Sequence, residues 1–188
     1  MSRSRPPSPL IEPKNPPARH SRLRLPPYRH VPGLTPHPVR HPEGHQYGAD
    51  EPAASPECAN LPEQWRECED YLYGIDLFNR AYLWEAHEAW EAVWIAVGKE
   101  GEPAAFVQGL IQVAAALLRL HLETPGGARN LMARAQRNLS EVEPGLLLRG
   151  RDRYMGVSVG AWLPLVERYL EHPGAAYPYL VVEPAEVS

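Results

Sequence analysis

The residues best suited to chemistry lie in the stretch Tyr82 to Val97, which contains the pattern His87-Glu88-x-x-Glu91. On an α-helix, His87 and Glu91 lie one turn apart on the same face. The pattern is close to the zinc-binding motif His-Glu-x-x-His, in which two residues four apart hold the metal and the Glu acts as a base. Glu91 replaces the second histidine, and a carboxylate still ligates a hard or borderline metal. The spacing therefore indicates a divalent metal ion held by His87 and Glu91, with Glu88 as the candidate base.

A third metal ligand must come from another part of the chain. Apart from His172 near its end, the helical region has one other histidine, His121, which we take as the candidate. A core histidine satisfied by its neighbours is the alternative interpretation of His121. The motif itself has two further interpretations. One is a buried hydrogen bond between His87 and Glu91 that orients the neighbouring tryptophans, and the other is a functional polar site without metal.

Polar residues of a later segment are possible partners for this group. Gln108, Gln112 and Arg119 fall within about 40° of one another on a helix. They form either a solvent-facing stripe or the inward partners of His87 and Glu91, because a buried His and Glu cost several kcal/mol unless they are paired. The tryptophans of the motif helix are most simply core residues, and they also suit the wall of a pocket for a planar or apolar ligand. The candidate polar or ligand-binding cluster comprises Trp84, Trp94, Gln108, Gln112 and Arg119.

A helix over Tyr82–Val97, ended by Gly98, must position the motif. His87 follows directly on the apolar arc of this helix, and Glu91 stands one turn further on. We therefore expect both side chains inside the face that packs against the rest of the protein, with Glu85 on the opposite side. The arc consists of Tyr82, Leu83, Ala86, Trp90, Val93, Trp94 and Val97.

Two further helices flank the motif helix in the sequence. Pro62 at a first helical position predicts a helix to about Asn79. A helix from Pro103 to about Glu123 is apolar over most of its circumference, which is typical of a helix at the centre of a bundle.

The remainder of the chain predicts two more helices and an extended tail. An amphipathic helix runs from about Ala128 to Val142, and another from about Ser158 to Glu171, where Pro164 is tolerable in the first turn. The apolar segment Tyr177–Val182 packs back on the helices. We predict an all-α bundle of about five helices over residues 61–182, followed by a C-terminal tail at 183–188.

The first 60 residues have a different composition. They hold 14 of the 22 prolines, and their 8 Lys and Arg against 5 Asp and Glu give a net charge of +3. Frequent proline and sparse apolar residues predict a disordered arm rather than a core. The arm is either a solvated tail or an electrostatic contact to nucleic acid or to an acidic partner. We assign its five histidines no metal role, because nothing preorganises them.

Charge, cysteines and hydropathy limit the class of protein. Residues 61–188 carry 11 Lys and Arg against 18 Asp and Glu, which argues against a nucleic-acid surface on the domain itself. Cys58 and Cys68 are too few for a disulfide scaffold and lack metal-ligand spacing, so we expect reduced thiols. The most apolar window, Ala104–Leu118, is too short to cross a bilayer. We expect a soluble, cytoplasmic protein with no membrane partner.

Several motifs together resemble the family of domain of unknown function 309 (DUF309). They are Phe78-Asn79, the run Tyr82-x-Trp-Glu-Ala-His-Glu-x-Trp-Glu-x-x-Trp94, the run Gln108-Gly-Leu-Ile-Gln-x-Ala-Ala-Ala-Leu117, and Gly127-Ala128 before a Leu-containing helix. The resemblance covers roughly residues 65–142 and implies a small all-helical domain without an assigned activity. The family's motif residues correspond to His87, Glu88, Glu91, Gln108, Gly109 and Gln112. Arg80 stands where the family usually has Gly, and the arm lies outside the family pattern.

Three functional hypotheses follow. The first is a binding or interaction module for an unknown protein or small molecule, with a buried His/Glu/Gln cluster as a brace and homo-oligomerisation as a possibility. It is favoured because the sequence has no nucleophile elbow, phosphate loop or full metal triad. The alternative is a metal-dependent, hydrolase-like enzyme that uses His87, Glu88 and Glu91. A third hypothesis makes the arm a nucleic-acid tether.

Overall fold

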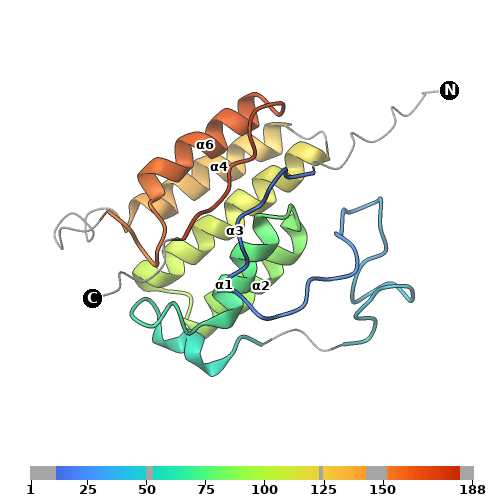
Figure 1. Ribbon diagram of the computed structural model, residues 1–188, viewed down its shortest axis with the longest axis horizontal. Helices are drawn as coiled ribbons and strands as arrows, with labels where there is room; N and C mark the ends of the chain where they lie inside the picture. Colours follow the sequence, from blue (N-terminus) through green and yellow to red (C-terminus); the bar gives the residue numbers. More distant parts are fainter. Residues whose placement is uncertain (1–11, 50–52, 123–124, 143–151, 183–188) are drawn as a thin grey trace.

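The protein is all-α, as predicted. The computed structural model describes residues 12–49, 53–122, 125–142 and 152–182. Within these ranges the only β-type pairing is an isolated bridge between Tyr154 and Val157. The elements are the 3-10 helix η1 (Pro56–Asn60) and the α-helices α1 (Glu69–Phe78), α2 (Leu83–Ala96), α3 (Gly101–His121), α4 (Pro125–Ser140) and α6 (Val159–Glu171) (Figure 1).

The helix α3 is the centre of the bundle, as its apolar circumference predicted. It lies between α2 on one side and α4 on the other, with α1 beyond α2 and α6 beside α4 (Figure 1). At 21 residues, α3 is long and apolar enough to cross a membrane by length and composition, so the expectation that this segment is too short was wrong. Half of its most apolar window is buried inside the protein. The central position accounts for its apolar composition.

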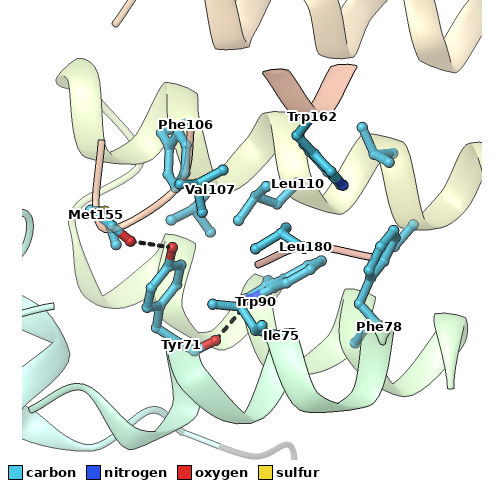
Figure 2. Packing of buried hydrophobic residues seen from close by; sticks show 14 of the residues in the cluster. Tyr71, Ile75, Phe78, Trp90, Phe106, Val107, Leu110, Met155, Trp162 and Leu180 are labelled. Carbon is cyan, nitrogen blue, oxygen red and sulfur yellow. Dashed lines mark hydrogen bonds between the residues drawn. The ribbon is translucent and has the colours of Figure 1, made fainter. Parts of the chain in front are cut away.

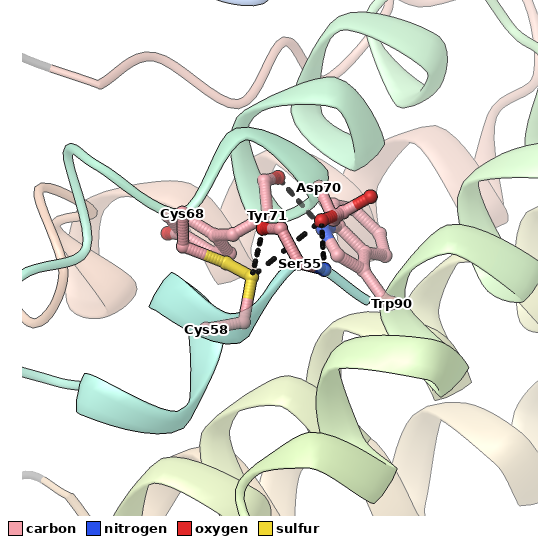
Figure 3. Close-up of a disulfide and its surroundings, with 6 residues drawn as sticks. All are labelled: Ser55, Cys58, Cys68, Asp70, Tyr71 and Trp90. Carbon is pink, nitrogen blue, oxygen red and sulfur yellow. Dashed lines mark hydrogen bonds between the residues drawn. A yellow bond between two sulfur atoms is a disulfide. The ribbon is translucent and has the colours of Figure 1, made fainter. Parts of the chain in front are cut away.

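The first helix begins later than predicted. Residues 61–67 form turns, and α1 starts at Glu69, with Glu69 and Asp70 placed favourably at the positive end of the helix dipole. The turns bring η1 back to the start of α1, where a disulfide joins Cys58 to Cys68 with the Cα atoms 4.7 Å apart (Figure 3). Both cysteines are fully buried. The expectation of reduced thiols is therefore contradicted, because the fold of residues 61–67 decides the distance between the cysteines.

The core is built on aromatic side chains from α1, α2, α3 and the C-terminal region (Figure 2). The indole of Trp90 donates a 3.1 Å hydrogen bond to the carbonyl of Tyr71. Trp90 lies directly on Gly74, where a Cβ atom would be 2.2 Å from the indole Nε1. A glycine is therefore required at this position of α1 for α2 to pack so closely.

The C-terminal segment packs on the helices as predicted. Asn79 donates to the carbonyl of Leu180 at 2.9 Å and accepts from its N–H at 2.8 Å. The hydroxyl of Tyr177 donates to the carbonyl of Phe78 at 2.6 Å. In α6, Pro164 is the sixth residue and not in the first turn, so the helix omits one backbone hydrogen bond there.

The described part of the arm, residues 12–49, has no helix or strand, which agrees with its proline content. It is not detached from the domain, however. It starts beside the C-terminal segment, passes over α1 and reaches the start of α2 (Figure 1). Many hydrogen bonds hold it there, the longest-range of which joins Lys14 to Tyr179. The composition of the arm did not indicate these contacts, because most of them involve its backbone.

Candidate functional site

His87, Glu88 and Glu91 project from one face of α2. Among the residues that the structure describes, they form a group with the spacing of a metal site. One ligand atom of each lies within 4.8 Å of the others. The His87 Nδ1 atom is 3.1 Å from Glu88 Oε1. The side chains of His87 and Glu88 are 32% and 34% exposed. A helical backbone thus presents an imidazole and two carboxylates together at the surface.

This exposure contradicts the expected burial of the motif. The buried residues of α2 include Leu83, Ala86, Trp90 and Val93, which turn the helix so that His87 falls at the edge of the packed face. The motif is therefore not an internal brace. Trp90 decides the rotation, since its large side chain fills the space above Gly74.

Gln108 and Gln112 do not pair with the motif in this structure. Both side-chain carbonyls accept hydrogen bonds from the amide of Asn138 on α4, at 3.1 and 3.0 Å. Arg119 lies further along α3, is exposed, and borders Gly127. These residues therefore connect α3 to α4. The sequence pattern did not single out Asn138, because it is one of several polar residues on an amphipathic helix.

His121 is separate from the His87 group among the described residues. It is the last residue of α3, and its Nε2 atom is buried with no hydrogen-bond partner in the described structure. Burial, together with the nearby positive charge of Arg29, lowers the pKa of His121 to about 4. The predicted set His87, Glu91 and His121 is thus not assembled, and Glu88 takes the third place in the group.

The three tryptophans of α2 lie in different surroundings. Trp84 packs edge-on against the rings of His30 and His37 of the arm, with ring centroids 5.0 and 5.2 Å away. Trp90 is a core residue. Trp94 is partly buried and lies under the ammonium group of Lys99, 5.2 Å from the ring centroid. Trp84 and Trp94 are almost three helical turns apart, so they do not wall one pocket.

Glu85 is a buried carboxylate that the sequence did not reveal. It points away from the bundle core, as predicted, but the arm covers it and leaves it only 7% exposed. Its Oε1 atom accepts a 2.6 Å hydrogen bond from the N–H of His30, while Oε2 has no partner among the described residues. Burial raises the pKa of Glu85 to about 7, against the opposing effects of the His30 N–H and the Arg29 charge.

The fold and the motif define a class of all-helical domain that carries a surface His-Glu-x-x-Glu group. The sequence model of one family, domain of unknown function (DUF309), matches residues 71–131. This match runs from α1 into α4 and includes the motif helix and Gln108, Gly109 and Gln112. The chain therefore contains a DUF309 domain, as its motifs indicated. No curated protein and no solved structure matches the chain.

Proposed function

We propose that the domain is a binding module that holds a divalent transition-metal ion at His87, Glu88 and Glu91. The observation that carries this proposal is the convergence of one imidazole and two carboxylates within 4.8 Å. Neutral imidazole and carboxylate together suit Zn²⁺, Mn²⁺ or Fe²⁺ better than Ca²⁺, which prefers oxygen ligands alone. The three side chains come from a little more than one helical turn, so the backbone fixes their spacing before any metal binds.

Binding is favoured over hydrolysis by the position of Glu88. Its carboxylate contacts the imidazole of His87 at 3.1 Å, so it belongs with the ligands and is not set apart as a base. Hydrolysis is nevertheless the second candidate function, because the group is open to solvent and a bound metal would keep positions for water. In that case Glu88 would act on the metal-bound water rather than ligate the metal.

Metal titration of the full chain by calorimetry tests the proposal. We expect one Zn²⁺ or Mn²⁺ per chain, with affinity reduced at least about tenfold by His87→Ala and by Glu91→Gln because each loses a ligand. His172→Ala is the matched control, since this exposed histidine lies at the end of α6. Equal binding by wild type and His87→Ala would contradict the proposal.

Glu88→Gln separates the two candidate functions. As a ligand, Glu88 contributes to affinity, so the variant binds metal more weakly. As a base, it contributes to turnover alone, so the variant binds metal normally and loses a metal-dependent hydrolysis of ester or phosphodiester reporters.

A further inference from the structure

We propose that the outer faces of α1 and α2, the turn between them and the C-terminal segment form a peptide-binding site. This site takes the main chain of an extended, proline- and arginine-rich segment, and residues 12–31 are its tethered, exchangeable ligand. This site is distinct from the His87 group and does not depend on the metal proposal. It is defined by carboxylates that accept from peptide N–H groups and by donors that reach peptide carbonyls.

Three carboxylates of the helical domain accept backbone N–H groups of the arm. Asp76 accepts from His20 and Ser21, each at 2.9 Å. Glu69 accepts from the N–H of Arg22 at 2.7 Å. Further along, Glu85 accepts from the N–H of His30 at 2.6 Å.

Side chains of the domain also donate to carbonyls of the arm. Tyr179 and Arg80 donate to the carbonyls of Lys14 and Pro17, at 2.5 and 2.9 Å. The hydroxyls of Tyr73 and Tyr82 donate to the carbonyls of Arg24 and Pro26, at 2.8 and 3.2 Å. Both hydrogen-bonding groups of the peptide backbone are therefore recognised along one extended path, as in known modes of recognition of extended peptides.

The charges of the arm match those of the site. The guanidinium of Arg19 lies 3.4 Å from the carboxylate of Asp76. Arg29 stabilises the charged form of Glu85. Because Asp76 and Glu85 are buried beneath the arm, these positive charges and the peptide N–H groups offset the cost of removing the two carboxylates from water.

The arm is attached as a ligand rather than as part of the core. Its residues 22–24 are exposed although the N–H of Arg22 and the carbonyl of Arg24 make anchoring contacts. Of residues 12–31, Leu25 packs against the margin of the main hydrophobic cluster, and Val31 is buried without belonging to that cluster. Detachment would therefore break mainly polar contacts and leave the packing of the helices intact. A tether gives the arm an effective concentration of about millimolar, so a second segment binds only when the arm is weakened.

Proline substitutions in the arm test the exchange without altering the site. Arg22→Pro removes the N–H that donates to Glu69, and its exposed side chain leaves no gap. Arg24→Pro is the matched control, because it removes the same charge from an exposed position but keeps the carbonyl that accepts from Tyr73. Circular dichroism of each full-length variant checks that the helices are intact.

The probe is a fluorescently labelled synthetic peptide of residues 12–31, titrated into each full-length protein and followed by anisotropy. We expect binding to Arg22→Pro that is at least about tenfold tighter than to wild type or Arg24→Pro, because the competing arm is weakened. A peptide that itself carries Arg22→Pro should bind this variant at least about tenfold more weakly than the native peptide.

Two results would overturn the proposal. One is equal or undetectable binding of the native peptide to all three proteins, which would make the arm a permanent part of the fold. The other is equal binding of the native and proline-substituted peptides, which would reduce the interaction to charge attraction. The metal titration above is independent of both results.

Discussion

The carboxylate of Glu85 accepts a 2.6 Å hydrogen bond from the backbone N–H of His30, a residue 55 positions earlier in the chain. This contact closes the arm over α2 and excludes water from Glu85. The other carboxylate oxygen has no partner among the described residues. Because a buried carboxylate is costly to keep charged, the stability of the protein with the arm in this position should depend on pH.

Glu85 should make the protein less stable as the pH rises from about 4.5 to about 7. Burial raises the folded-state pKa from 4.5 to about 7, so over this range the folded protein keeps a proton that the unfolded chain has released. Glu85→Gln removes this effect and retains an acceptor for His30. From pH 4.5 to 8, urea unfolding should show wild type losing about 2–3 kcal/mol relative to Glu85→Gln. Glu63→Gln, at an exposed position, should leave the slope in place. An unchanged slope in Glu85→Gln would contradict the assignment.

His121 should have the opposite effect on stability in acid. Its folded pKa is lowered from 6.5 to about 4, so the unfolded chain gains a proton that the folded protein does not, and stability is lost as the pH falls through this range. His121→Leu removes the unpartnered Nε2 atom. We expect the variant to gain about 1–2 kcal/mol over wild type at pH 4.5 relative to pH 7.5, allowing for partial exposure. His172→Leu, at an exposed position, should show no such gain. The absence of a gain in His121→Leu would show that water reaches the ring of His121.

Gly74→Ala should destabilise the protein by about 3 kcal/mol. The new methyl group would lie 2.2 Å from the indole of Trp90, so α1 and α2 must separate. Gly160→Ala is the matched control on α6, because a Cβ there meets nothing within 4 Å and replacing a helical glycine stabilises by up to about 1 kcal/mol. Thermal and urea unfolding compare the two variants. A similar stability for both would mean that Trp90 does not rest on Gly74.

Reduction of the Cys58–Cys68 disulfide should destabilise the protein by about 2–3 kcal/mol, because the bond closes a short loop in the unfolded chain. Thiol titration of the denatured, unreduced protein should find no free cysteine. The double variant Cys58→Ser/Cys68→Ser should then be insensitive to reductant, whereas wild type loses stability. Two titratable thiols in freshly prepared protein would show that the bond is not formed.

The cytoplasmic localisation stays a prediction.

The sequence by itself determined the helices, the central place of α3 and the family motif. These features are local, because apolar side chains repeat with the helical period and α3 is apolar around most of its circumference. The same periodicity placed Glu85 correctly on the side of α2 away from the core. It also brought His87, Glu88 and Glu91 to neighbouring positions on one helix.

The tertiary structure decided what surrounds those residues. The packing of Trp90 on Gly74 set the rotation of α2 and left His87 at the surface, and Asn138 took Gln108 and Gln112 as partners. The turns after η1 brought the two cysteines together. The docking of the arm could not be predicted from composition, because peptide N–H and carbonyl groups occur at nearly every position. Only the three-dimensional arrangement of the carboxylates and donors that meet them selects this path.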